Sequence, residues 1–173
     1  MHFEYGGGWF RARRKMTRCM SKQQAQTNYA VREKMAIAAY DDDASAPFGF
    51  IELKGTALNV IIFDEHQRSR FVAQFSELEP GRLFMDTTQH RWFRPGSTEM
   101  KDVALMEERT LRPDGHVEIR RIDVDREQTW VSRTDGNDVG PAWIDYPAFG
   151  AFEPIFRQMH SLCATYDTPP VTH

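Results

Sequence analysis

The chain has 173 residues, of which 40% are hydrophobic, 12% aromatic and 27% charged, and its net charge is −3. This length suits one domain and is short for two, so we predict a single domain over residues 1–173, with its core over about 3–163. No apolar run approaches the roughly 20 residues of a membrane-spanning helix, and the N-terminus lacks the apolar segment of a secretory signal. We therefore expect a cytoplasmic protein without a membrane partner, in which the widely separated Cys19 and Cys163 stay reduced.

The charged residues are unevenly distributed along the chain. From Arg11 to Lys34 there are eight basic residues and one acidic residue, whereas acidic residues outnumber basic ones from Glu99 to Asp145. A basic strand near aromatic residues is one feature of nucleic-acid binding, but an acidic second half repels phosphate. We therefore predict no nucleic-acid partner, and expect the basic and acidic segments to pair with each other or to face solvent.

The first quarter of the chain predicts two strands. Residues 9–17 are expected as a strand because basic residues alternate there with smaller or apolar ones. "SKQQAQT" (21–27) is expected as a polar loop. A second strand is expected over 29–40, although its Ala, Met, Glu and Lys content also suits a helix, and "DDDASAP" (41–47) breaks the chain.

Further strands follow at short intervals, separated by turn signals. Phe71, Ala73 and Phe75 alternate with polar residues and therefore share one face of their strand. "EPGR" (79–82) is expected as a turn. The strands predicted in this part of the chain cover residues 48–54, 57–63, 68–76, 83–87 and 90–93.

The clearest local pattern is a hairpin over residues 103–124. "RPDG" joins its two arms, because proline presets the backbone of a turn and Gly115 accepts a positive φ. In the second arm the apolar residues change phase, which predicts a β-bulge near Arg120 and Arg121. A last strand is expected over 127–133.

The only helix that the sequence predicts covers residues 154–162. Pro154 suits a first helical position, and the apolar residues that follow it recur at helical spacing. Pro147 and Gly150 make the aromatic residues before it part of a loop. Residues 164–173 are expected as a flexible tail.

These elements predict a mainly β protein with one short C-terminal α-helix. Eight or nine sequential strands form an antiparallel meander, and a flat sheet of that length would expose its edges. We therefore expect a barrel or a highly curved half-barrel.

The sequence offers no catalytic constellation, cofactor motif or metal-ligand spacing. Asp123, Asp125 and Glu127 would share a face in a strand and could bind a cation, but without converging ligands from elsewhere a solvent-facing acidic row is the simpler explanation. The six histidines form no HxH or HExxH arrangement. If the protein is an enzyme, the candidates for acid–base catalysis are His90, Glu107, Glu118 and Arg120, and the sequence does not choose among them.

Aromatic residues give the remaining signal. Those on predicted strands fill the interior of a small barrel or line a ligand pocket. Those on the loop before the helix either close the end of the core or contact a ligand or partner, since loops often carry function. The candidate binding residues on this loop are Trp143, Asp145, Tyr146, Phe149 and Phe152.

Two partial resemblances extend these expectations. "GGW" at 7–9 resembles the G-x-W that opens lipocalin-like (calycin) barrels, in which an arginine of the last strand packs on the tryptophan and a helix follows. Here Arg133 ends the last predicted strand, so the resemblance implies a Trp9–Arg133 pair in a barrel that binds a small hydrophobic ligand. Elsewhere that resemblance is one of topology.

The second resemblance covers about a third of the chain. The hairpin "ERTLRPDGHVEIRR" followed by "WIDYPAFGAF" resembles the C-terminal part of small bacterial cytoplasmic proteins, some of them similar to immunity proteins that accompany polymorphic toxins. It implies non-catalytic occlusion of a toxin's active site. We therefore expect a non-enzymatic binding protein with a protein partner. The alternatives are a calycin-like barrel that binds a small hydrophobic ligand, or an enzyme on that scaffold. The oligomeric state is left open.

Overall fold

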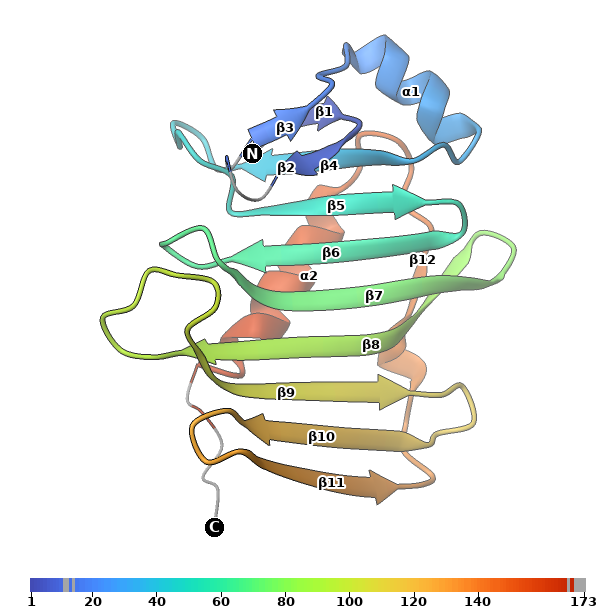
Figure 1. The fold of residues 1–173 in the computed structure, drawn as a ribbon. Helices are drawn as coiled ribbons and strands as arrows, with labels where there is room; N and C mark the ends of the chain where they lie inside the picture. Colours follow the sequence, from blue (N-terminus) through green and yellow to red (C-terminus); the bar gives the residue numbers. More distant parts are fainter. Residues whose placement is uncertain (11–12, 14, 168, 170–173) are drawn as a thin grey trace.

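The computed structural model describes residues 1–10, 13, 15–167 and 169. Within these residues the chain forms twelve strands and two α-helices (Figure 1). In chain order the elements are β1 (His2–Gly6), β2 (Gly8–Phe10), β3 (Lys15–Thr17), α1 (Lys22–Ala30), β4 (Met35–Tyr40), β5 (Gly49–Lys54), β6 (Ala57–Phe63), β7 (Ser69–Glu79), β8 (Arg82–Phe93), β9 (Val103–Leu111), β10 (Val117–Asp123), β11 (Gln128–Thr134), a 3-10 turn (Gly140–Ala142), β12 (Trp143–Asp145) and α2 (Glu153–Ala164).

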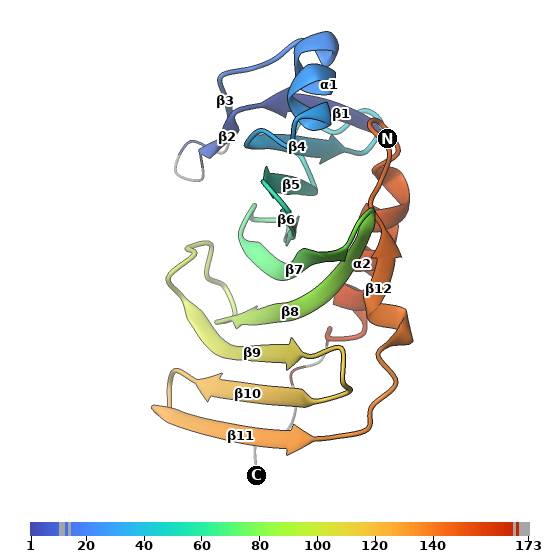
Figure 2. The ribbon, with the colours of Figure 1, turned by 90° about the vertical axis from the view of Figure 1, so that its right-hand side faces the viewer.

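One antiparallel sheet dominates the molecule. Its strand order is β1-β4-β5-β6-β7-β8-β9-β10-β11, and β12 pairs with the start of β8. β1 and β11 lie at opposite ends of the sheet, and no described residues pair these two strands. The sheet twists strongly along its length (Figure 2). The predicted mainly β meander is therefore confirmed, and it takes the form of a curved half-barrel that is not closed.

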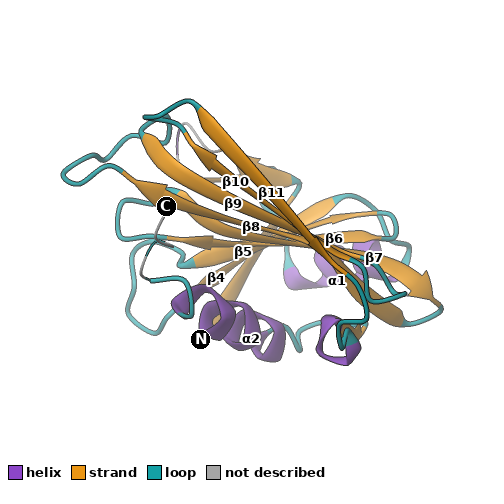
Figure 3. Ribbon diagram, turned by 90° about the horizontal axis from the view of Figure 1, so that it is seen from below, coloured by secondary structure: helices purple, strands orange, loops and turns teal. Residues whose placement is uncertain are grey.

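The two faces of the sheet are covered differently. α2 lies along one face, called here the helix face, as Figures 2 and 3 show. Four of its apolar side chains are buried, at Ile155, Phe156, Met159 and Cys163. A Cβ at Gly49 would lie only 2.5 Å from the backbone oxygen of Ile61 in the neighbouring strand β6, so the pairing with that strand requires glycine here, whereas its distance of 3.4 Å to the Phe156 ring would be an ordinary contact. The predicted helix over 154–162 is confirmed and extends slightly at both ends.

The opposite face carries the β2–β3 hairpin, and only over one end of the sheet. Trp9 is buried there, with its ring 5.7 Å from the rings of both Phe50 and Phe63. Met16 of β3 joins the same small cluster. Val72 of β7 also packs against this cluster, whereas β8 to β11 contribute no residue to it among the described residues.

The N-terminal predictions need correction. The strand predicted over 9–17 is the hairpin of β2 and β3, and residues 11, 12 and 14 lie outside the described part. The segment 21–27, predicted as a loop, opens α1, and the strand predicted over 29–40 begins only at Met35. A capping box explains α1, since Ser21 accepts from the Gln24 backbone N–H and the Gln24 side chain accepts from that of Ser21. Only Ala25 of α1 is buried, so no apolar periodicity revealed it.

Other differences concern the strands. β1 and β12 were not predicted, and the two strands predicted at 83–87 and 90–93 form the single strand β8. The bulge predicted near Arg120 and Arg121 is wrong, because β10 pairs without a register shift on both sides. The strands predicted at 57–63 and 103–111 are confirmed at both ends. The tail predicted as flexible lies largely outside the described residues and stays a prediction. No described helix is long and apolar enough to cross a membrane.

Candidate functional site

The aromatic residues from 143 to 156 pack against distant parts of the fold, among them β1 and α1. Phe152 and Phe156 are fully buried. Phe149 lies against Tyr5 of β1 and Tyr29 of α1, with ring centroids 5.3 and 5.5 Å apart. These contacts link the segment after β12 to the N-terminal end of the sheet, which fits the closure of the core.

Phe149 is half-buried, and the other predicted residues of this loop apart from Phe152 are half-buried or exposed. Tyr146 is half-buried under the guanidinium of Arg32, which lies 3.7 Å from the centre of its ring. Trp143 is half-buried between Phe84 and Arg82. The centre of its ring lies 5.0 Å from the centre of the Phe84 ring and 4.8 Å from the Arg82 guanidinium. Asp145 is exposed. Direct contact of these residues with a ligand or partner stays a prediction.

The structure does not bring Trp9 and Arg133 together. Trp9 lies in the β2–β3 hairpin over β4 to β6, whereas Arg133 lies on β11 at the far edge of the sheet. Arg133 instead pairs with Glu118, with 2.6 Å between Nε and the carboxylate oxygen. The expected pair required a closed barrel, and the open sheet keeps its two ends apart.

A row of five side chains crosses the helix face from β7 to β11. Each member is the register partner of the next, so all five project from the same face. The row starts apolar near α2, becomes charged at its centre and ends at a half-buried tryptophan. Its members are Phe71, His90, Glu107, Arg121 and Trp130.

His90 is the most unusual member of the row. Its side chain is only 2% exposed, and neither ring nitrogen has a hydrogen-bond partner among the described residues. The rings of Trp92 and Phe71 lie 4.3 and 6.0 Å away. Burial lowers the pKa of His90 to about 4, and the nearby charge of Arg70 acts in the same direction. His90 is therefore a neutral, buried imidazole at neutral pH.

Glu107 lies beside His90 and is also 2% exposed. Its two carboxylate oxygens accept hydrogen bonds from Nε of Arg109 at 2.7 Å and Nε of Arg121 at 2.6 Å. Burial raises the pKa of Glu107, but these two hydrogen bonds and charges outweigh it and lower the pKa overall. The carboxylate is therefore ionised and fixed in position between two cations.

The segment that follows α2 covers this part of the row. The Tyr166 ring lies 5.2 Å from the ring of His90, and the Arg109 guanidinium lies 4.9 Å from the centre of the Tyr166 ring. The carbonyl oxygen of Tyr166 accepts a hydrogen bond of 2.9 Å from Nε1 of Trp92. Asp167 pairs with Arg70 at 2.5 Å.

The structure thus separates the four acid–base candidates into two pairs. His90 and Glu107 are neighbours on the helix face, whereas Glu118 and Arg120 project from the opposite face. Sequence reasoning could not find the first pair, because its two members are 17 positions apart and meet only through the β8–β9 register.

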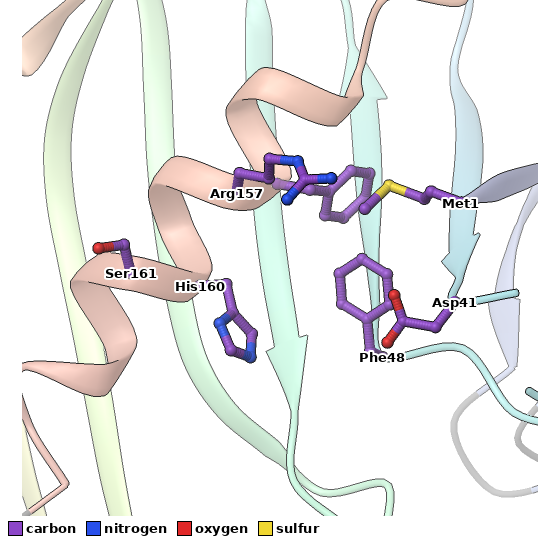
Figure 4. Close-up of a pocket in the computed structure, with 7 residues that line it drawn as sticks. Met1, Asp41, Phe48, Arg157, His160 and Ser161 are labelled. Atoms are coloured by element: carbon purple, nitrogen blue, oxygen red, sulfur yellow. The ribbon is translucent and has the colours of Figure 1, made fainter.

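A separate pocket of about 430 Å³ lies between α2 and the β4–β5 loop (Figure 4). Phe48 and Phe156 contribute aromatic rings to its lining, with centroids 5.5 Å apart. Figure 4 shows Arg157 and Asp41 on different sides of Phe48. Its volume lies in the range of small-molecule sites, and it combines apolar and charged lining.

The described residues contain no group of three or more His, Cys, Asp or Glu side chains that could hold a metal ion. Asp123 ends β10, while Asp125 and Glu127 lie in the turn before β11, so the three do not share one strand. Asp125 instead pairs with Arg94.

Comparisons with protein-family models, with curated proteins and with solved structures gave no match for this chain. The resemblances to calycin barrels and to immunity proteins accordingly stay predictions.

Proposed function

We propose that the chain is a cytoplasmic binding protein that acts through a protein interface, with toxin neutralisation as its specific form. The observation that carries this proposal is the hairpin of β10 and β11, called here the wing. Its two strands form seven register pairs, yet none of their residues is buried. A hairpin that buries no side chain gains little hydrophobic stabilisation of its own, and a partner would supply the missing contacts.

The wing has the composition of an interface. Trp130 is half-buried on the helix face, and Val131 is 47% exposed on the opposite face. Tryptophan and arginine are the residues most enriched where binding energy concentrates, and the wing also presents Arg120 and Arg121.

β11 is also a sheet edge. No described strand pairs with its outer side, and its sequence "QTWVSRT" contains neither proline nor lysine, the residues that commonly protect edges. Its ladder with β10 is regular. An extended segment of a partner could therefore add to this edge by backbone hydrogen bonds.

The acidic residues contribute less to this proposal than the sequence suggested. Glu107, Glu118, Asp102 and Asp125 each pair with an arginine of the same half of the molecule. Their charges are therefore largely compensated, and long-range steering of a basic partner is weakened. The supporting features are the exposed strands and the wing's Trp130, not an acidic patch.

A second candidate function is the binding of a small hydrophobic molecule. The pocket in Figure 4 favours it, because its 430 Å³ would hold a ligand with an aromatic ring against Phe48. A polar substituent on that ligand would lie within reach of Arg157 or His160, which also line the pocket.

Native mass spectrometry of the protein purified from its host tests both candidates. We expect the wild-type protein to carry a stoichiometric partner chain. Leu78→Asp is the control and should keep that chain, because it changes an apolar residue that is 52% exposed and lies outside the wing. Val131→Asp should lose that chain, because it places a charge on the wing. Retention of the partner by Val131→Asp would overturn the wing as the interface. A stoichiometric small molecule without a protein, lost on Ser161→Trp, would support the second candidate instead.

A further inference from the structure

On the basis of the proposed function, we infer that the surface now covered by Tyr166 and Asp167 binds a partner segment in which an aromatic residue is followed by an acidic one. The chain's own segment occupies this surface in cis. The surface, called here the Tyr166 site, is defined by His90, Trp92, Arg109 and Arg70.

The site recognises an aromatic ring from two directions. The ring of His90 lies on Tyr166 at an interplanar angle of 33°, and Arg109 lies over the Tyr166 ring. Glu107 fixes the Arg109 guanidinium in place through a hydrogen bond. A cation held in advance over an aromatic position favours any ligand that brings a π-face to it.

The site also recognises backbone. Nε1 of Trp92 donates to the carbonyl oxygen of Tyr166, so the contact reads the peptide group and not the side chain. A segment of different sequence can accept the same hydrogen bond. Specificity then comes from the aromatic ring on one side and the acid on the other.

Charge complementarity defines the acidic position. Asp167 is exposed, yet it pairs with Arg70 at 2.5 Å. Beyond it lies a pocket of about 260 Å³ whose lining includes Arg68, Arg70 and Arg91. Among the described residues around the site and this pocket, arginines outnumber carboxylates, although the whole chain carries a net charge of −3. The arginines are Arg68, Arg70, Arg91, Arg109 and Arg121, and the carboxylates of the surface itself are Asp64, Glu65 and Glu107.

The fit of the segment in cis is incomplete. Tyr166 and Asp167 lie beyond the last residue of α2 and cover polar groups, whereas the apolar core lies under α2 itself. Tyr166 leaves both nitrogens of His90 without a partner among the described residues. A buried polar group without a partner is unfavourable, so a ligand whose polar group reaches His90 gains contacts that the segment in cis does not make.

A fluorescently labelled peptide with the sequence of residues 164–169, "ATYDTP", tests the inference by fluorescence anisotropy. The full chain carrying Tyr166→Gly and Asp167→Gly should bind it at least about tenfold more tightly than the wild-type chain, in which the segment in cis competes. Tyr166→Ala alone serves if the double variant does not fold. Replacing the tyrosine of the peptide by alanine should weaken binding about tenfold, and adding Arg70→Ala to the protein should remove the preference for aspartate over asparagine.

Several outcomes would overturn the inference. The first concerns the Tyr166→Gly and Asp167→Gly variant, called here the emptied variant. If it folds but binds the peptide no better than the wild-type chain does, or binds a scrambled peptide equally well, then Tyr166 is only a packing residue. A wild-type dimer that dissociates on Tyr166→Ala would assign the site to a second copy of this chain. Val131→Asp in the emptied background should leave peptide binding unchanged, so failure of the wing and failure of the Tyr166 site are distinguishable.

Discussion

His90 makes the stability of the protein depend on pH in a way that one substitution can isolate. Its pKa is lowered from 6.5 to about 4 in the folded protein, because burial removes water from the imidazolium and Arg70 repels it. Glu107 and Asp167 act in the opposite direction but do not compensate. The unfolded chain therefore binds a proton at a higher pH than the folded protein does.

The sign and size of the effect follow from this difference. Stability is full above pH 6.5 and falls as the pH drops towards 4, because protonation then favours the unfolded state. One unit of pKa difference corresponds to about 1.4 kcal/mol, so the loss is about 2 kcal/mol at pH 5 and about 3 kcal/mol below pH 4. His90→Leu removes this titration. It also removes two buried nitrogens without partners, so we expect the variant to be at least as stable as the wild-type protein at pH 7.

Urea denaturation at pH 7 and pH 5 measures the effect as a difference of differences. From pH 7 to pH 5, the free energy of unfolding of the wild-type protein should fall by about 2 kcal/mol more than that of His90→Leu. His66→Gln is the control, because it changes a histidine whose side chain is 39% exposed, and it should behave like the wild-type protein. Titrating groups that all three proteins retain contribute to each of them and largely cancel in the comparison. An equal loss in the wild-type protein and in His90→Leu would refute the reasoning, since folding would then not lower the pKa of His90.

Three further predictions, one of them with a control substitution, probe the rest of the fold. Glu107→Gln should destabilise the protein by about 2 kcal/mol in thermal denaturation, because it leaves two cations facing each other, whereas Glu118→Gln, in an accessible pair, should change stability by less than about 1 kcal/mol. Ser21→Ala should cost about 1 kcal/mol and speed amide exchange in α1, since it removes the N-cap; unchanged exchange would contradict this role. Phe149→Ala should cost about 3 kcal/mol in urea denaturation if the aromatic loop closes the core. Intact stability with lost partner binding would instead show a contact surface.

The sequence predicted the parts of the fold whose signal is local. β6 and β9 alternate cleanly or run apolar between turn signals, and Pro154 with the spaced apolar residues marked α2. α1 was missed because almost none of it is buried, so its evidence lay in the capping box at Ser21 and Gln24. The false bulge in β10 arose because the wing is open on both faces, and apolar residues there need not keep one phase.

The candidate site was beyond sequence reasoning for a different reason. His90, Glu107 and Arg121 meet because two strand registers align them, and a shift of one residue in either ladder would send one of them to the opposite face. Tyr166 reaches them only because α2 returns along the helix face. The only available signal was the presence of His90 and Glu107 among the acid–base candidates, with nothing to join them.

The return of the chain along the helix face has a consequence for the order in which the protein folds. Most strands pair with a neighbour in the sequence, so much of the sheet can assemble while the chain is being synthesised. Much of the apolar helix face is covered by residues 142–163, with Ala25 and Tyr29 of α1 packing against the same cluster, and a hydrogen bond from Tyr29 to the carbonyl oxygen of Pro147 spans 118 positions. A nascent chain that ends before α2 therefore exposes part of an apolar sheet face, a surface of the kind that favours aggregation before folding is complete.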